Sequence, residues 1–141
     1  MIAVDTNILV YAHREESRKH RAARVRLEEL ATGSAQWGLP VYCIHEFVRI
    51  VTHPRVFYPP TSLDEALAAL DALLESPTLM VLHPGNRWWT LFRRLASEGG
   101  AGGNLVFDAA IAAVCQERGA RTILTENRDF SRFDSPVPEA L

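Results

Sequence analysis

The chain has 141 residues, 48% of them hydrophobic, and a net charge of −2. This length predicts a single domain over residues 1–141 that needs no disulfide or structural zinc, and the charge argues against a simple basic nucleic-acid binder. The sequence shows no signal peptide and no apolar run near the roughly 20 residues that span a membrane, so the chain is expected to be soluble and cytoplasmic. Its two cysteines, Cys43 and Cys115, are expected to be buried free thiols.

Apolar strands and amphipathic helices alternate along the first half of the chain. Residues 2–5 and 36–41 have the composition of buried strands. Between them, residues 17–31 place apolar and basic side chains at helical spacing. A further apolar helix is predicted over residues 43–53, and Pro54 ends it because proline cannot continue the helical hydrogen bonding.

The second half continues this alternation. Ser62 and Glu65 form a capping box that begins a helix running to residue 75. Asn104 is expected to cap another helix, which ends near Gly119. The other predicted elements are a strand over 78–83, a helix over 86–97 capped by Asn86, a strand over 121–125 and a short edge strand around Val137. This order favours an α/β fold with parallel strands and helices on both faces.

In such folds the functional crevice lies outside the carboxyl ends of the strands. Asp5 ends the first strand, where its carboxylate either projects into the crevice or caps a helix. Asp108 lies in an apolar helix, on one stripe with Ile111, Ala112 and Cys115. A buried carboxylate there must pair with a cation, accept hydrogen bonds or bind a metal, because burying it alone costs several kcal/mol.

Two further carboxylates fall near the same edge of the sheet. Glu46 lies in the first turn of its predicted helix, either facing the crevice or solvated beside Arg49. Asp129 follows a strand end, where it could instead cap a short turn. Together with Asp5 and Asp108 they form an oxygen-only set that suits Mg²⁺ or Mn²⁺. Such a cation lowers the pKa of a bound water for attack on phosphorus.

Four motifs carry a resemblance to a known family. They are Asp5-Thr6-Asn7-Ile8-Leu9, His45-Glu46-Phe47, Asp108-Ala109 and Thr125-Glu126-Asn127-Arg128-Asp129-Phe130. Over essentially its whole length the chain resembles PIN domains, and more narrowly the VapC ribonuclease toxins of type II toxin–antitoxin modules. The resemblance implies a three-layer α/β/α sandwich with a mostly parallel sheet of about five strands, and an Mg²⁺-dependent endoribonuclease in which Mn²⁺ could substitute.

The resemblance also implies roles for individual residues. Asp5 and Asp108 match the main metal ligands, and Glu46 matches a second acidic position that binds the metal directly or through water. Many relatives carry an acid where this chain has Asn127, so Asp129 is the remaining carboxylate of that motif. The expected catalytic set is Asp5, Glu46, Asp108 and Asp129, supported by Thr6, Asn7, Thr125 and Asn127.

The partners that the resemblance implies are RNA, an antitoxin and a second copy of the chain. Arg14, Arg128 and Arg132 are expected to contact RNA, since the arginine fork suits phosphate oxygens. Family antitoxins lay a tail over the active site, and the toxins are usually homodimers.

Other acidic α/β enzymes fit less well. Haloacid-dehalogenase-type phosphatases need a second aspartate where this chain has Asn7, and both they and response-regulator receivers need a lysine. The single lysine here is Lys19, far from the required place in the sequence. A PIN-like protein that kept its metal pocket but serves as a binding or scaffold protein remains the alternative.

Overall fold

The computed structural model describes all 141 residues and contains a five-stranded sheet. Its strands are all parallel and lie in the order β3-β2-β1-β4-β5. The α/β fold and the parallel sheet are therefore confirmed. The strands are β1 (Ile2–Val4), β2 (Trp37–Pro40), β3 (Leu79–Leu82), β4 (Thr122–Leu124) and β5 (Val137–Glu139).

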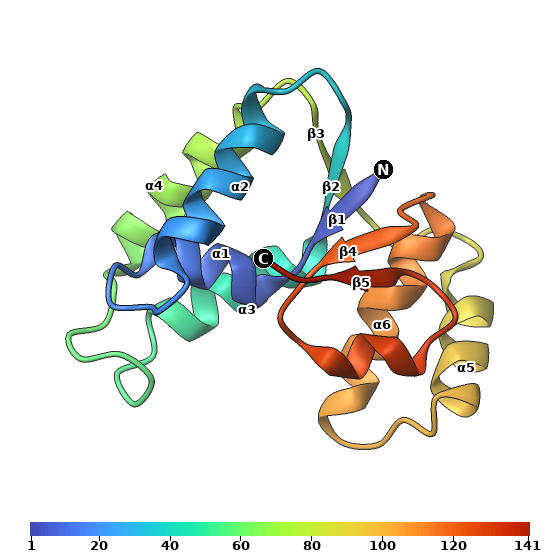
Figure 1. The fold of residues 1–141 in the computed structure, drawn as a ribbon. Helices are drawn as coiled ribbons and strands as arrows, with labels where there is room; N and C mark the ends of the chain where they lie inside the picture. Colours follow the sequence, from blue (N-terminus) through green and yellow to red (C-terminus); the bar gives the residue numbers. More distant parts are fainter.

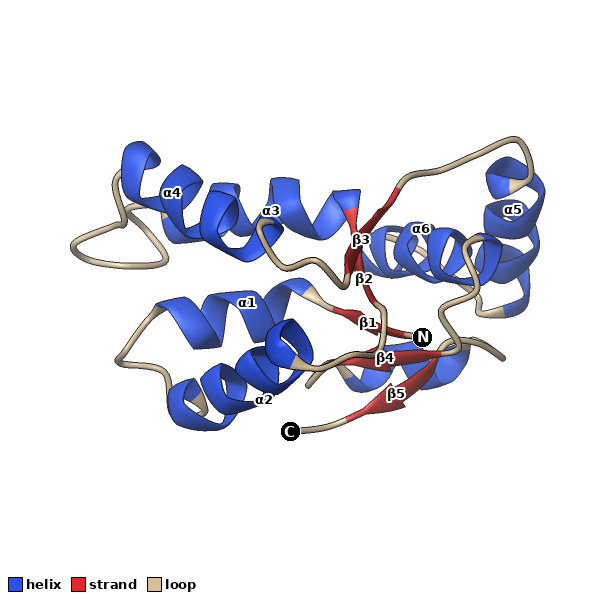
Figure 2. Ribbon diagram, turned by 90° about the horizontal axis from the view of Figure 1, so that it is seen from above, coloured by secondary structure: helices blue, strands red, loops and turns tan.

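Helices cover both faces of the sheet and make three layers (Figures 1 and 2). From β1 the chain moves outward to β2 and β3, and it later returns past β1 to β4 and β5. Because crossovers between parallel strands are right-handed, reversing direction moves the helices to the opposite face. One face carries α1 (Thr6–His13), α2 (His20–Thr32), α3 (Val41–Val51) and α4 (Leu63–Leu74), and the other carries α5 (Trp88–Glu98), α6 (Asn104–Glu117) and the 3₁₀ helix η1 (Arg128–Arg132).

Several element boundaries differ from the sequence expectation. Helix α1 was not predicted, because its apolar residues continue directly from β1 without a turn signal; the Asp5 side chain caps it. Helix α3 begins two residues earlier than predicted, which puts Glu46 in its second turn rather than its first. Asn86 caps no helix, and Asn104 is the first helical residue of α6, after Gly103 with its positive φ of 59°.

The core lies between the sheet and both helical layers. Trp37 of β2 and Phe130 of η1 are among its largest fully buried side chains. Cys43 and Cys115 are both buried and free. No helix has the length and apolar character needed to cross a membrane.

The register of the central strands positions the crevice. Val4 of β1 pairs with Leu124 of β4, so the next residues, Asp5 and Thr125, leave the sheet side by side. The backbone N–H of Asp5 still donates to the carbonyl of Leu124, at 3.0 Å. The order in which strands are added to the sheet switches from one side of β1 to the other between β3 and β4, so the switch point lies between β1 and β4. Open α/β sheets form their ligand crevice at such a point.

Candidate functional site

A hydrogen bond between two buried side chains links the ends of β1 and β4. Thr125 Oγ1 donates to Asp5 Oδ2 at 2.6 Å, and both residues are at most 4% exposed. The other oxygen of Asp5 accepts from the Thr6 N–H at 2.7 Å, as a helix cap. Asp5 therefore does both things that its position in the sequence allowed: it caps α1 and it lines the crevice.

Two asparagines extend this network around the strand ends. Asn7 Nδ2 donates to Asp5 Oδ2 at 2.8 Å and to Thr125 Oγ1 at 3.1 Å. The N–H of Asn127 donates to the same threonine oxygen at 2.9 Å. Asn127 Nδ2 in turn donates to Asp108 Oδ2 at 3.2 Å. The network thus connects the motifs at residues 5–7, 108 and 125–127 through side-chain hydrogen bonds.

The structure brings Asp5, Glu46 and Asp108 around one small cavity, here called the carboxylate pocket. Its volume is about 130 Å³, enough for a cation with its waters. The Thr6 hydroxyl in its wall is buried and has no hydrogen-bond partner. The full lining is Asp5, Thr6, Asn7, Glu46, Ile50, Asp108, Ile111 and Asn127.

Burial and mutual repulsion disfavour the charged carboxylates. Burial raises the pKa of Asp5 against the opposing effect of its hydrogen bonds. Burial and the charge of Asp5 raise the pKa of Glu46. The pKa of Asp108 rises to about 6, chiefly through burial and then through the charges of Asp5, Asp129 and Glu46, while the Asn127 hydrogen bond opposes the rise. A cation in the pocket would relieve this repulsion.

The donors around the carboxylate pocket fit a hard divalent cation. They are carboxylates, amides and hydroxyls, which are oxygen ligands of the kind that Mg²⁺ and Mn²⁺ prefer. No three His, Cys, Asp or Glu side chains are already close enough together to hold an ion. The unpartnered Thr6 hydroxyl gives the pocket a buried polar atom that a bound water or ion would satisfy.

Asp129 lies apart from the other three acids. It is exposed in η1, and its side chain does not line the carboxylate pocket. Its backbone N–H donates to Asn127 Oδ1 at 3.0 Å. Asp129 lines a second, larger cavity that adjoins the carboxylate pocket and is here called the outer pocket. This cavity has a volume of about 530 Å³ and is lined by Glu46, Arg49, Gly103, Asn104, Val106, Phe107, Asp108, Asn127 and Asp129.

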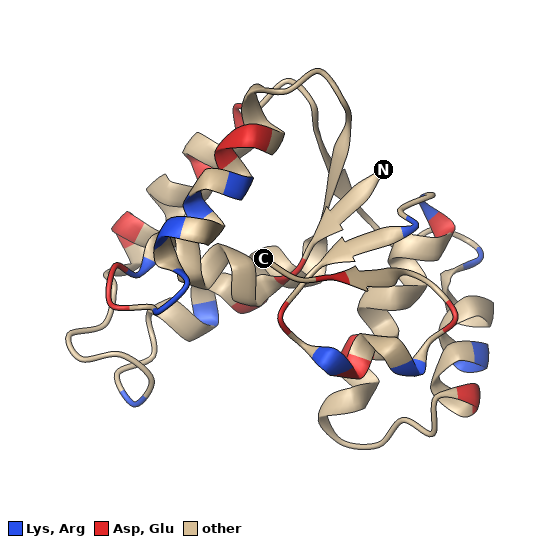
Figure 3. Cartoon of the chain, in the orientation of Figure 1, with Lys and Arg blue, Asp and Glu red and all other residues tan.

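The predicted arginines have different surroundings. Arg128 and Arg132 are exposed on η1, beside the 125–129 motif. The Arg14 guanidinium instead holds the loop before α4, where it donates to Thr61 and Pro59 and lies 4.4 Å from the Phe57 ring centroid. Figure 3 shows acidic segments near the ends of the central strands and basic segments along α2.

Two residues of the outer pocket were missed by the sequence reasoning. Arg49 was noted only as a local partner of Glu46, and the two side chains do form an ion pair at 3.8 Å. Phe107 lies in a helix whose apolar sequence predicts burial, yet its side chain is 45% exposed. The sequence gives one indication that Phe107 lies at the site, which is its position directly before Asp108 in the first turn of a helix.

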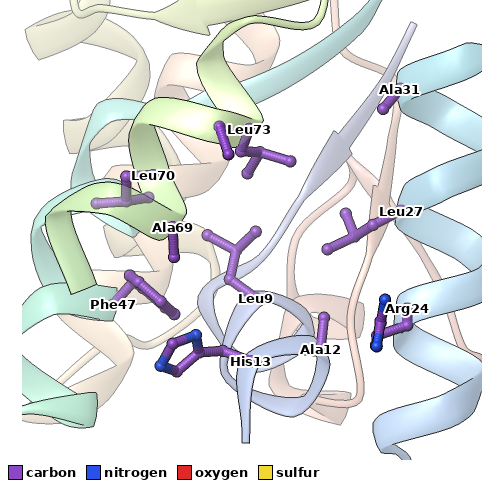
Figure 4. Close-up of a pocket in the computed structure, with 11 residues that line it drawn as sticks. Leu9, Ala12, His13, Arg24, Leu27, Ala31, Phe47, Ala69, Leu70 and Leu73 are labelled. Carbon is purple, nitrogen blue, oxygen red and sulfur yellow. The ribbon is translucent and has the colours of Figure 1, made fainter. Parts of the chain in front are cut away.

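A more apolar hollow than either of these pockets lies elsewhere. It is a groove of about 440 Å³ between α1, α2, α3 and α4, shown in Figure 4. Leu9, Leu27, Phe47, Leu70 and Leu73 line it, and no carboxylate does. The groove therefore lacks the chemistry of the carboxylate pocket, and the candidate site remains at the strand ends.

Comparison with known proteins gives consistent matches. A family model for the PIN domain matches residues 2–136. Ribonuclease VapC43 of Mycobacterium tuberculosis is 47% identical over 133 residues, covering 94% of this chain and 90% of that protein. Ribonuclease VapC31 of the same organism is 32% identical, with 96% and 94% covered.

Solved structures share the fold at low sequence identity. VapBC2 from Rickettsia felis, bound to a promoter DNA fragment, matches with a TM-score of 0.72 and 21% identity over 100% of this chain and 99% of that one. VapC20 of Mycobacterium tuberculosis, a sarcin–ricin loop cleaving toxin, matches with a TM-score of 0.67 and 18% identity, with 93% of each chain covered.

Replacing Thr125 by valine should destabilise the protein. The change removes the donor to Asp5 and the acceptor for Asn7 and Asn127, and it leaves buried groups unpaired. We expect urea unfolding to show a loss of about 2–4 kcal/mol. Thr125→Ser keeps the hydroxyl and should lose about 1 kcal/mol. Equal losses in the two variants would show that the hydroxyl network contributes little.

Replacing Asp108 by asparagine should stabilise the metal-free protein at neutral pH. The folded-state pKa of Asp108, about 6, lies above its ordinary value of 3.8. The folded state therefore binds the proton more tightly, and this contribution to stability is complete below about pH 4 and lost as the pH rises through about 6. Removing the charge should restore about 1 kcal/mol, a figure already reduced for the partial exposure of the carboxylate.

The measurement is urea unfolding in EDTA at about pH 4 and about pH 7.5. We expect the gain only at the higher pH, where Asp108 is charged. Asp71→Asn, at an exposed carboxylate of α4, serves as the matched control and should change little. A gain of the same size at both pH values would mean that the charge of Asp108 is not its cause.

Proposed function

Because this chain belongs to the PIN-domain family and to the VapC ribonucleases within it, we propose that it is a metal-dependent endoribonuclease. We propose Mg²⁺ as its cation, with Mn²⁺ as a substitute, and the toxin role in a type II toxin–antitoxin module. Its place of action would be the cytoplasm, and its substrate the phosphodiester bonds of RNA.

The observation that carries the proposal is the carboxylate pocket. Asp5, Glu46 and Asp108 come from three separate motifs and line one cavity with the unpartnered Thr6 hydroxyl. The folded chain keeps these carboxylates together although their burial, and then their repulsion, raises the pKa of Glu46 and Asp108. A protein gains nothing in stability from such an arrangement, so it indicates a ligand that neutralises the charge.

The side chains of the pocket have separate tasks in this proposal. Asp5 and Asp108 would hold the cation, and Glu46 would contact it directly or through water. Thr125 and Asn7 fix the orientation of Asp5, while Asn127 fixes that of Asp108. When bound, the cation supplies a water of lowered pKa and compensates the charge of the phosphate.

The outer pocket and η1 would receive the RNA strand. Asp129 lines the outer pocket, so we assign it an auxiliary catalytic role near the substrate rather than a place among the ligands. Arg128 and Arg132 lie exposed beside it and can donate to phosphate oxygens. We leave Arg14 out of the RNA contacts because its guanidinium is bonded to the 59–61 loop.

A non-catalytic binding or scaffold role is less well supported. Such a protein would have no need to keep three converging carboxylates and a support network for two of them. The relatives at 47% and 32% identity are both named ribonucleases. No feature of the structure favours the scaffold role over the nuclease.

We also propose an antitoxin partner and a homodimer. The matches to solved VapBC complexes from Rickettsia felis and Salmonella typhimurium support a toxin–antitoxin module. The antitoxin would silence the enzyme by covering the carboxylate pocket, where an arginine could pair with the unneutralised carboxylates.

Cleavage of RNA should depend on Mg²⁺ and on the carboxylate pocket. We expect the purified protein to cut RNA with Mg²⁺ or Mn²⁺ and to stop in EDTA. Asp5→Asn and Asp108→Asn should lower the rate at least about 100-fold, since a metal site contributes several kcal/mol to catalysis. Gel assays of labelled RNA measure this, with Asp71→Asn as the control on α4.

A second readout separates metal binding from catalysis. Mg²⁺ should raise the melting temperature of the wild type and of Asp71→Asn, but not of the two pocket variants. Full cleavage in excess EDTA would contradict the proposal. RNA binding without cleavage, under every divalent metal, would support the scaffold alternative instead.

The antitoxin proposal can be tested by co-expression. A small gene next to the one for this chain should encode a protein that co-purifies with it at a fixed stoichiometry. That complex should cut RNA more slowly than the isolated chain. Sedimentation of the isolated chain should give the mass of a dimer. A neighbouring protein that neither binds nor inhibits would contradict the module.

A further inference from the structure

One wall of the outer pocket is aromatic and open to solvent. Phe107 lies directly before Asp108 in the first turn of α6, and its side chain is 45% exposed. Its neighbour Val106 is 41% exposed. Large apolar side chains exposed inside a cavity are a feature of ligand sites, because each exposed face costs hydration free energy until it is covered.

The Phe107 ring is supported on one side. It makes an edge contact with Tyr42 at the start of α3, with ring centroids 6.3 Å apart and an interplanar angle of 73°. Tyr42 in turn lies 6.2 Å from Trp88, whose indole N–H donates to the Ala110 carbonyl of α6. These contacts hold the ring in place, while nearly half of it remains available to a ligand.

The outer pocket continues directly from the carboxylate pocket. Glu46, Asp108 and Asn127 line both cavities. A strand whose scissile phosphate lies at the carboxylates must therefore place a neighbouring nucleotide in or over the outer pocket. Its volume of about 530 Å³ falls in the range of sites for small organic ligands.

The polar part of the lining favours a nucleotide over an apolar side chain of a protein. Asn104 and Asn127 offer amide groups, and Arg49 offers a guanidinium that is 61% exposed. Amides can bond to the edges of a base, a cation can contact a phosphate, and an aromatic ring can stack on the base face. An apolar partner would leave the Asn104 amide and the guanidinium of Arg49 without hydrogen bonds.

We propose that Phe107 is a stacking platform for the base of a nucleotide next to the scissile phosphate. The proposal rests on the proposed ribonuclease function and adds a substrate-positioning residue to it. Phe107 supplies no group for the chemical step. Its effect should therefore appear in the binding of RNA, in KM more than in kcat.

The test compares cleavage kinetics of four proteins on three substrates. The proteins are the wild type, Phe107→Ala, Phe107→Tyr, which keeps a ring, and Leu67→Ala, which shortens an equally exposed apolar side chain on α4, outside both pockets. The cut position in RNA is first mapped with the wild type. One oligoribonucleotide then carries the mapped sequence, and two others carry an abasic residue on one or the other side of the cut.

On the intact oligoribonucleotide, Phe107→Ala should lower kcat/KM by about 5- to 150-fold, which is the range for base–aromatic stacking. Phe107→Tyr and Leu67→Ala should stay within about 3-fold of the wild type. On one of the two abasic substrates, Phe107→Ala and the wild type should cut equally well, because the base that stacks is missing. This equality is the result that a merely structural role would not produce.

Other outcomes overturn the inference. These are equal cleavage of the intact substrate by wild type and Phe107→Ala, or the same loss on all three substrates. Loss of cleavage together with a change in oligomeric state, followed by gel filtration, would assign the face to a protein interface instead. A wild type that cuts no RNA with any divalent metal would overturn the proposed function as well, so the two failures can be told apart.

Discussion

The hydrogen bond from Thr125 to Asp5 is the contact on which the rest of the site depends. It joins the ends of two neighbouring parallel strands that are 120 residues apart in the sequence. Asn7 donates to Asp5, and the backbone N–H of Asn127 donates to Thr125. The Asn127 side chain donates to Asp108 of α6, which lies on the other face of the sheet from α1. The side chains that follow the strand ends therefore set the orientation of Asp5 and Asp108, whereas Glu46 pairs with Arg49 of its own helix.

The same arrangement places three carboxylates close together in a buried or partly buried site. Burial raises the pKa of Asp5, Glu46 and Asp108, and repulsion between the carboxylates adds to the rise at Glu46 and Asp108. The metal-free pocket is therefore a costly part of the fold. The fold can bear this cost because the apolar core that stabilises it covers the two faces of the parallel sheet, whereas the charged crevice lies at the strand ends. A bound cation would remove the repulsion between the carboxylates, and this relief would contribute to the affinity of the pocket for the cation.

The two cavities divide the work of the proposed enzyme. The carboxylate pocket is small and lined by oxygen donors, whereas the outer pocket is larger and combines acids with Arg49 and Phe107. The chemistry and the positioning of substrate would thus depend on different side chains of the same helices. Such a separation allows substrate preference to change by substitution in the outer pocket while the carboxylates stay in place.

The sequence by itself determined the alternation of strands and helices and the strand-end positions of Asp5 and Thr125, because hydrophobic periodicity and helix caps are local signals. The tertiary structure alone decided that α1 follows β1 without a turn, that α3 begins early enough to put Glu46 in its second turn, and that Asp129 lies outside the carboxylate pocket. It also decided that Phe107 is exposed in a helix that is apolar almost all round. Exposure and distance depend on packing between segments far apart in the chain, which no local pattern encodes.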